Sequence, residues 1–297
     1  MTGRELGLLL LTSHLGRKER KTLTVAQMKK LGERVEAHPG LIGDILTTEH
    51  LLAMGCTPEL ARQIMTLLSE RKLAEDYIRR GERLGMTLLT WFDPRFPDTL
   101  RKRLKGECPP ILWVKGDLEL LNQRAVSIVG SRDIKLPNSE FARTVGTEAA
   151  KHGYVLVTGR APGADQQAMA TCMQAGGSVI AVVPDSLLFK NPAPRELFVS
   201  LYDYDADFSS PRALERNHVI HSWGYATFVA QSSVIRSGTW SGTNHNLKNH
   251  LSPVLFCDDG SEAMSRAVRM GARNVDIREV KDFEALWEPF YRQEEPG

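Results

Sequence analysis

The sequence predicts an α/β protein in which a doubly wound, mostly parallel sheet follows a small helical domain. From about residue 124, short β-branched runs such as Ala125–Val129 alternate with helical stretches. These runs are apolar almost throughout, which is typical of strands that are covered on both faces. Before about residue 84, in contrast, the apolar spacing is helical. Because strand–helix alternation builds right-handed crossovers, we expect a Rossmann-like domain over residues 85–297.

The composition is that of an ordinary globular protein. The 297 residues are 42% hydrophobic and 25% charged, which is enough for one large domain and a smaller one. The net charge is only +2, so a nucleic-acid site would have to arise from local clustering of basic residues. The four cysteines are dispersed and lack C-x-x-C spacing, which favours reduced thiols and a cytoplasmic location.

The N-terminal part predicts a small helical domain over residues 1–84. Thr57 and Pro58 are residue types preferred at the N-cap and at the first position of a helix. The apolar run at residues 8–11 is short and no small-residue cleavage site follows it, so we expect neither a signal peptide nor a membrane helix. The helices are expected over 23–37, from residue 47, and over 59–84.

The second domain is expected to alternate strands and helices. We expect irregular structure over 184–213 and a C-terminal helix over 281–291 that packs on the sheet. The predicted strands are 86–91, 111–114, 125–129, 154–157, 178–183, 227–230 and 253–256, and the predicted helices are 139–151, 164–174, 214–222, 243–250 and 261–270.

Two loops that follow predicted strands have the residue types of an anion site. Glycine lets the backbone approach a ligand closely, and exposed N–H groups favour anions. Arginine is a forked donor that matches phosphate. Ligands of doubly wound sheets bind at the carboxyl ends of the strands, so the loops predict a phosphate site; the alternative is tight turns with solvated arginines. The first loop contains Gly130, Ser131 and Arg132, and the second contains Thr158, Gly159, Arg160, Gly163 and Asp165.

A third stretch adds further candidate residues. Arg212 and Arg216 lie four residues apart, a spacing that places both on one face of a helix, with Asn217 next to them. After the strand at 227–230 come Ser237, Gly238, Thr239 and Trp240. An exposed tryptophan there could stack on a base, whereas the alternative is a buried tryptophan in the core.

Motifs of the common catalytic sites are absent from the sequence. It has no G-x-G-x-x-G, no G-x-x-x-x-G-K-[ST], no H-E-x-x-H and no G-x-S-x-G. No close pair of acidic residues suggests acid–base chemistry, and we expect Asp165 to cap the following helix or to orient an arginine. We therefore expect a binding protein without a catalytic reaction, a metal or a cofactor.

Taken in order, these motifs resemble the DprA/Smf family of DNA-processing proteins. The resemblance implies a Rossmann-like domain that binds single-stranded DNA, a homodimer, and loading of a RecA-type recombinase during natural transformation, with no cofactor. Apolar faces on the helices at 263–270 and 283–290 also favour a dimer. The segments that carry the resemblance are 89–100, 109–117, 127–132, 158–165, 215–217 and 237–239.

The second loop departs from the family pattern. Pro162 stands where the family usually has a basic residue, and Ala164 replaces a branched residue. The segment 184–212 is also unlike the family. Two other functions therefore stay open: a nucleotide-ligand sensor or nucleoside-phosphate hydrolase of the same superfamily, with phage defence as a possible role, and a scaffold without a ligand.

Overall fold

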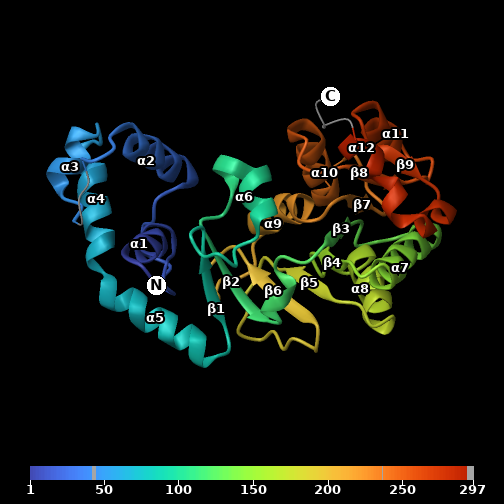
Figure 1. Ribbon diagram of the computed structural model, residues 1–297, viewed down its shortest axis with the longest axis horizontal. Helices are drawn as coiled ribbons and strands as arrows, with labels where there is room; N and C mark the ends of the chain where they lie inside the picture. Colours follow the sequence, from blue (N-terminus) through green and yellow to red (C-terminus); the bar gives the residue numbers. More distant parts are fainter. Residues whose placement is uncertain (42–44, 236, 293–297) are drawn as a thin grey trace.

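The computed structural model describes residues 1–41, 45–235 and 237–292, and one nine-stranded sheet runs through it (Figure 1). The strands lie in the order β1-β2-β6-β5-β4-β3-β7-β8-β9. Within the described sheet β2 runs against both of its neighbours, and every other pairing is parallel. The strands are β1 (Thr87–Thr90), β2 (Ile111–Gly116), β3 (Ala125–Val129), β4 (Val155–Thr158), β5 (Val179–Val182), β6 (Glu196–Ser200), β7 (Thr227–Val229), β8 (Val254–Cys257) and β9 (Arg273–Val275).

The order of the parallel strands is doubly wound. From β3 the chain moves outward through β4 and β5 to β6, and it then returns to the other side of β3 with β7, β8 and β9. The predicted fold class is therefore confirmed. The reversal between β3 and β7 is the point at which such sheets leave a crevice for a ligand.

Helices cover both faces of the sheet (Figure 1). Alternate residues of β3 point to opposite sides, so that Val126 packs with α7 and α8 while Val129 packs with α9 and α10. The strand is buried along its whole length, which explains its apolar composition. The helices that follow β1 are α6 (Asp98–Leu104), α7 (Leu136–Lys151), α8 (Ala164–Gln174), α9 (Ser210–Trp223), α10 (Gly238–Asn249), α11 (Glu262–Arg269) and α12 (Glu288–Arg292), with 3-10 turns η1 (Lys105–Glu107), η2 (Leu118–Leu120), η3 (Ile277–Lys281) and η4 (Phe283–Leu286).

Five helices precede the sheet: α1 (Gly3–Thr12), α2 (Val25–Ala37), α3 (Thr48–Ala53), α4 (Pro58–Ser69) and α5 (Arg71–Arg83). Threonine caps the N-termini of the first four helices, and the expected cap at Thr57 with Pro58 after it is confirmed. The single helix predicted over 59–84 is wrong, because the chain breaks at Glu70 between α4 and α5. None of the described helices combines the length and the apolar character that crossing a membrane requires.

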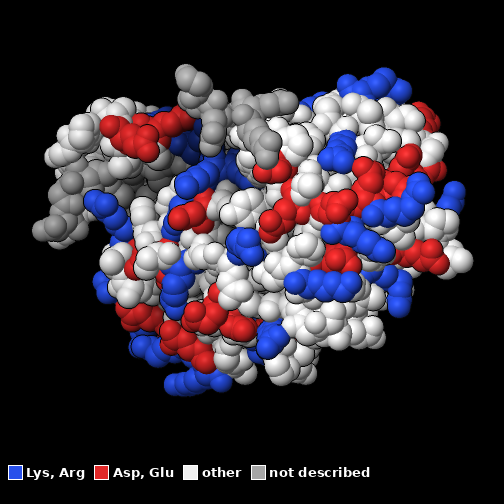
Figure 2. All heavy atoms as spheres, turned by 45° about the vertical axis from the view of Figure 1, so that its right-hand side comes forward, with Lys and Arg blue, Asp and Glu red and all other residues white. Residues whose placement is uncertain are grey.

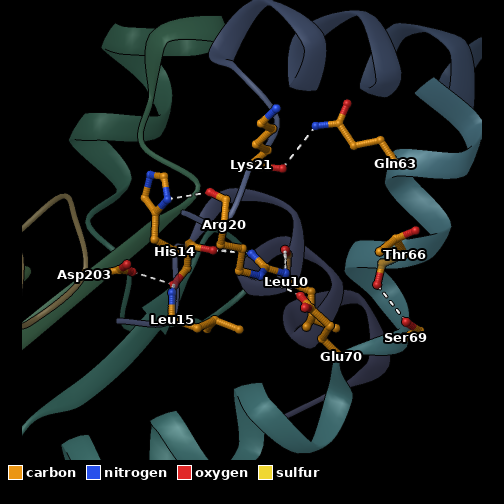
Figure 3. Close-up of polar contacts among 11 residues, drawn as sticks. Leu10, His14, Leu15, Arg20, Lys21, Gln63, Thr66, Ser69, Glu70 and Asp203 are labelled. Atoms are coloured by element: carbon orange, nitrogen blue, oxygen red, sulfur yellow. Dashed lines mark hydrogen bonds and ion pairs between the residues drawn. The ribbon is translucent and has the colours of Figure 1, made fainter. Parts of the chain in front are cut away.

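A buried arginine fixes this break (Figure 3). Arg20 donates from Nη2 to the carbonyl oxygen of Leu10 at 2.6 Å, from Nη1 to that of Ser13, and from Nε to the Glu70 carboxylate at 2.6 Å. Its guanidinium therefore satisfies carbonyl groups at the end of α1 and holds the corner between α4 and α5. Hydrogen bonds to charged groups contribute about 1.5–3 kcal/mol each, more than neutral ones.

The N-terminal helices and the sheet share an apolar cluster. Leu9 of α1 and Tyr77 of α5 pack with Trp113 of β2 and with Tyr204, and all four side chains are buried. The Tyr77 and Tyr204 rings stack with centroids 4.3 Å apart, and Trp113 meets Tyr204 edge-on at 4.7 Å. The helical part is thus fastened to the β1–β2 edge of the sheet.

Four further differences from the sequence-based expectation concern β6, α6, β9 and the C-terminal helix. The stretch expected to be irregular contains β6, whose five residues are fully buried and begin with Glu196. α6, which carries most of the basic run at 101–105, and β9 were not predicted. The C-terminal helix expected over 281–291 is divided into η4 and α12, which still place Phe283 and Trp287 against the sheet.

Candidate anion-binding site

A hollow of about 590 Å³ opens at the switch point between β3 and β7. Its walls are the loops after these strands, the loop after β4, and the first turns of α9 and α10. The sequence-predicted residues that line it are Gly130, Ser131, Arg132, Asp165, Arg216, Asn217, Ser237, Gly238 and Thr239. Most of the predicted site residues, although far apart in the sequence, are therefore brought together.

The loop after β3 is held tightly at its first residue. A Cβ atom on Gly130 would lie 2.3 Å from the Cβ of Ala164 and 3.3 Å from that of Ala230, so only glycine fits there. The Gly130 carbonyl accepts a hydrogen bond from Thr239 Oγ1 at 2.9 Å. Two residues on, Arg132 is exposed at the rim, and it forms no ion pair within the described part of the chain. Its guanidinium is available to an anion.

Arg216 supplies a buried positive charge beneath the hollow. Only 5% of this residue is exposed, and its Nη1 donates to the Val182 carbonyl at 3.2 Å. The guanidinium occupies the space over Gly159, where a Cβ atom would lie 1.2 Å from Nη1. Its Nε is buried and has no hydrogen-bond partner among the residues described. A buried donor without a partner costs free energy, so this atom indicates a missing acceptor in the hollow.

Asp165 faces this arginine and shapes the loop after β4. Its Oδ2 accepts hydrogen bonds from the backbone N–H groups of Gly159 at 3.1 Å and Ala161 at 3.2 Å. Burial raises the pKa of Asp165 above its ordinary value, and the nearby Arg216 opposes that rise. Burial likewise lowers the pKa of Arg216, and Asp165 opposes the fall. The two groups thus stabilise each other's charge in a buried place, while Asp165 folds the loop back on itself.

The two loops interlock through Gly163. This glycine has a φ of +82°, a left-handed conformation that other residues adopt at a cost. A Cβ atom on it would lie 2.2 Å from the Ser131 carbonyl oxygen and 2.5 Å from that of Arg132. The Ser131 carbonyl also accepts from the Ala164 N–H at 3.1 Å. The position of Arg132 therefore depends on this glycine in the neighbouring loop.

The N-terminus of α10 forms another wall of the hollow. Ser237 is its N-cap and accepts from the Trp240 N–H at 3.3 Å, and Asn217 of α9 donates to the Gly238 carbonyl at 3.1 Å. Free N–H groups and the helix dipole make the start of a 12-residue helix a favourable place for an anion.

Two of the predicted arginines point elsewhere. Arg160 has a φ of +54° and lies over the Phe198 ring at 4.6 Å, where it pairs with Glu196 of β6 at 3.3 Å. Thr158, next to it, is buried. Arg212 lies over the Tyr202 ring at 4.9 Å and borders a neighbouring hollow, so it does not act beside Arg216. The helical spacing of Arg212 and Arg216 did not reveal that the Arg212 guanidinium packs on the Tyr202 ring instead.

Trp240 is a core residue. It is 9% exposed and packs in the apolar cluster on the α9–α10 side of the sheet, with the Arg266 guanidinium 5.4 Å from its ring centre. The proposed stacking of a base on Trp240 is therefore excluded in this conformation, and the core alternative is correct. Three apolar residues that the sequence did not single out line the hollow instead: Phe208, Leu214 and Ile235, which are 55%, 41% and 74% exposed.

The surface outside the hollow has no single-sign field on the face that Figure 2 shows. Lysine and arginine side chains alternate there with aspartate and glutamate side chains. This face thus agrees with the net charge of +2, which also favours local clustering over a whole-chain field.

Comparison with known proteins identifies the family. A family model described as DNA recombination-mediator protein A matches residues 87–284, which is most of the chain. This chain belongs to that family. The resemblance predicted from the motifs is thereby confirmed, and the matched region includes every strand of the sheet and all the loops of the hollow.

Relatives of the DNA recombination-mediator family align with parts of the chain. Protein Smf of Synechocystis sp. is 30% identical over 130 residues, and the DNA processing protein DprA of Bacillus subtilis is 33% identical over 89 residues. These matches cover 41% and 30% of this chain, and only 31% and 29% of the relatives. The chain thus aligns with about a third of the length of each.

Solved structures of the family share the fold. DprA from Streptococcus pneumoniae superimposes with a TM-score of 0.73 at 20% identity, over 95% of this chain and 98% of that one. DprA from Helicobacter pylori gives a TM-score of 0.57 at 23% identity, over 67% of this chain and 95% of that one. The latter structure concerns the single-stranded DNA binding mode of the Helicobacter protein.

Proposed function

We propose that this chain binds single-stranded DNA in the hollow beyond β3, β4 and β7. The observation that carries the proposal is the buried Arg216, which lines the hollow and whose Nε lacks a partner among the described residues. A DNA phosphate placed there would supply the missing acceptor. The same phosphate would meet the N-terminus of α10 and the exposed Arg132 at the rim.

A strand fits the shape of the site better than a free nucleotide does. The hollow is open, and exposed apolar side chains of Phe208, Leu214 and Ile235 stand at its border. A nucleotide pocket would enclose its base, whereas a strand needs phosphate contacts beside open apolar surfaces on which several bases can rest. The relative from Helicobacter pylori, whose structure concerns binding of single-stranded DNA, supports the same ligand.

We extend the proposal to the role of the whole chain. It acts as a recombination mediator without a catalytic reaction or a cofactor, forms a homodimer, and passes its DNA to a RecA-type recombinase during DNA uptake. Membership of the DNA recombination-mediator family supports this role. The hollow holds one carboxylate, Asp165, which is engaged with two N–H groups and faces Arg216, so it is poorly placed as a general base.

The proposal also covers the division of the chain. Residues 1–84 form a helical unit and residues 85–297 form the DNA-binding unit. All the residues that line the hollow belong to the second unit. The first unit lies at the far edge of the sheet, beyond β1 and β2 (Figure 1).

Fluorescence anisotropy tests the ligand. Labelled oligothymidine would be titrated with the protein, and unlabelled duplex DNA, nucleoside monophosphates and NAD would then be added as competitors. We expect saturable binding of the single strand that weakens steeply with salt, and no displacement by mononucleotides at equal concentration. Displacement by a mononucleotide alone would refute the proposal in favour of the sensor or the hydrolase. The absence of binding at low salt would refute it and leave the scaffold without a ligand as the alternative.

A further inference from the structure

A cluster of metal-ligating side chains lies outside the hollow. It consists of Glu107 at the end of η1, His218 of α9 and His245 of α10. One ligand atom from each residue lies within 4.8 Å of the other two. His218 follows Asn217, which lines the hollow, so its side chain is turned about 100° further round the helix. The cluster therefore faces η1 rather than the anion site.

The two imidazoles are close, and one of them has a ring nitrogen without a hydrogen bond in the described part of the chain. Their rings stack in parallel with centroids 3.7 Å apart and an angle of 4° between the planes. His245 Nε2 lies 3.2 Å from a Glu107 carboxylate oxygen, yet it is buried and forms no hydrogen bond with any described residue. A buried ring nitrogen in this state, beside a second imidazole and a carboxylate, indicates a ligand that the three groups share.

We propose that Glu107, His218 and His245 bind one divalent transition-metal ion of the zinc class. Imidazole nitrogens and a carboxylate oxygen are the ligands that zinc and its neighbours prefer. Three protein ligands leave a coordination position for water. The proposal is independent of the DNA site, because no member of the cluster lines the hollow.

His245 has a polar neighbour at its second ring nitrogen, as metal-bound histidines usually do. The Asn249 side-chain amide lies 3.3 Å from His245 Nδ1. Binding of the ion at Nε2 requires a proton on Nδ1, so this amide must turn by about 180° to accept it and give up its hydrogen bond to the His245 carbonyl oxygen at 3.0 Å.

Binding requires a small contraction of the cluster. Metal–ligand distances of about 2.0–2.2 Å bring the donor atoms to within roughly 3–3.6 Å of one another, so the stacked rings must tilt out of parallel. Glu107 can follow, because its side chain is 60% exposed and sits on a three-residue turn. The ion would then join η1 to α9 and α10.

Cobalt absorption provides the direct test. The full-length protein, freed of metal by a chelator and dialysed, would be titrated with Co²⁺ while its visible spectrum is recorded. We expect intense bands of a four- or five-coordinate ion that saturate at one equivalent and disappear when Zn²⁺ is added. Zn²⁺ should also raise the melting temperature of the wild-type protein.

Two variants and one control assign the ligands. Loss of an outer-shell partner alone weakens metal binding by roughly 10–100-fold, so Glu107→Gln and His245→Asn should each weaken it by at least about 100-fold. His250→Asn removes an exposed histidine near the end of the same helix and should leave binding unchanged. Circular dichroism would verify the fold of each variant, and because the Glu107 side chain is exposed we expect Glu107→Gln to fold like the wild type.

Several results would overturn the assignment. These are a wild-type spectrum of a six-coordinate aquated ion, saturation at several equivalents, or equal binding by the wild type and a folded Glu107→Gln variant. A melting temperature that Zn²⁺ raises equally in the wild type and in His245→Asn would have the same consequence.

Discussion

At the scale of single residues, the exposed Arg132 and the buried Arg216 have different expected roles. Arg132 stands at the rim without an ion pair in the described chain, so its charge is free to contact a phosphate. Arg216 lies beneath the hollow with Asp165 and the Val182 carbonyl around it. The first is expected to contribute affinity, whereas the second contributes both affinity and the architecture of the loops.

Arg132→Ala should weaken single-stranded DNA binding equally for all base compositions. A phosphate contact carries no base information, and loss of a charged hydrogen bond costs roughly 1.5–3 kcal/mol. The slope of log affinity against log salt should fall by roughly 0.7. Anisotropy at several salt concentrations measures both quantities. Arg71→Ala, which removes an exposed arginine of α5, is the matched control; similar behaviour of the two variants would contradict the assignment.

Phe208→Ala should weaken DNA binding without a change in the salt slope. Stacking of a base on an aromatic ring contributes roughly 1–3 kcal/mol, and no ion is released when it is lost. Phe208 is 55% exposed, so the stability of the fold should hardly change. Phe189→Ala removes an 86% exposed phenylalanine that does not line the hollow and should bind like the wild type. If Phe208→Ala binds as tightly as this control, no base rests on Phe208.

Arg216→Met should destabilise the protein in a pH-dependent way. Removal of one partner from a buried charge pair costs about 3–5 kcal/mol, because Asp165 loses the positive charge that opposes the effect of its burial. Burial raises the pKa of Asp165 in the folded state, so the stability of the variant falls as the pH rises above the unfolded value of about 3.9. Urea unfolding at pH 4.5 and pH 7.5 should therefore show a smaller loss, relative to the wild type, at the lower pH. An equal loss at both pH values would show that Asp165 does not respond to Arg216.

At the scale of the elements, the loops after β3 and β4 form one interlocked unit. Gly163 presses against the Ser131 and Arg132 carbonyls, and Asp165 holds the backbone of the second loop. A change in the loop after β4 is therefore expected to move the residues of the loop after β3.

Gly163→Ala should impair both stability and DNA binding. The left-handed φ costs about 1–3 kcal/mol for a residue with a Cβ atom, and the contact with Ser131 forces the loop to shift. Gly153→Ala is a matched control, because Gly153 has a φ of +70° but nothing within 4 Å of its Cβ position. We expect that control to lose about 1–2 kcal/mol of stability and to keep full DNA affinity. Unfolding and anisotropy on both variants separate backbone strain from steric displacement.

The elements that the sequence predicted well are those with strong apolar runs. The strand at 125–129 agrees with β3 at both ends, because continuous burial on both faces leaves an apolar signature. The helix at 164–174 also agrees with α8 at both ends. β6 had no such signature, since it begins with Glu196 and follows a proline-rich stretch. Glu196 is buried because Arg160, from a different loop, pairs with it, and a long-range contact of this kind cannot be inferred from spacing.

The site was predictable to a similar extent. Glycine, serine and arginine directly after a strand predict an anion site, and the strand order places these residues next to the N-terminus of α10. The sequence could not show that Tyr202 turns Arg212 away or that Trp240 belongs to the core. Nor could it place Phe208 in the same hollow as Arg132, because the intervening chain has no periodicity that fixes its path.

At the scale of the whole molecule, we predict a homodimer. The apolar faces of α11 and η4, which favoured a dimer in the sequence, are occupied within the chain, where Ala267 and Phe283 are fully buried. The prediction therefore depends on the family alone. Sedimentation equilibrium at micromolar concentration should give twice the chain mass of 33.2 kDa. A single species at the monomer mass over that range would refute it.

The position of β6 also has a consequence for the order in which the chain can fold. β2 pairs with β1 and with β6, which lies some eighty residues further along the chain, and the Trp113 cluster needs Tyr204 from just beyond β6. During synthesis, the N-terminal helices and the β1–β2 pair therefore emerge long before the strand that attaches them to the sheet. Pairing at such sequence separation is slow, and until β6 pairs with β2 the β1–β2 segment exposes an apolar edge. Attachment of the helical part should thus be a late event that follows completion of the β3–β6 half of the sheet.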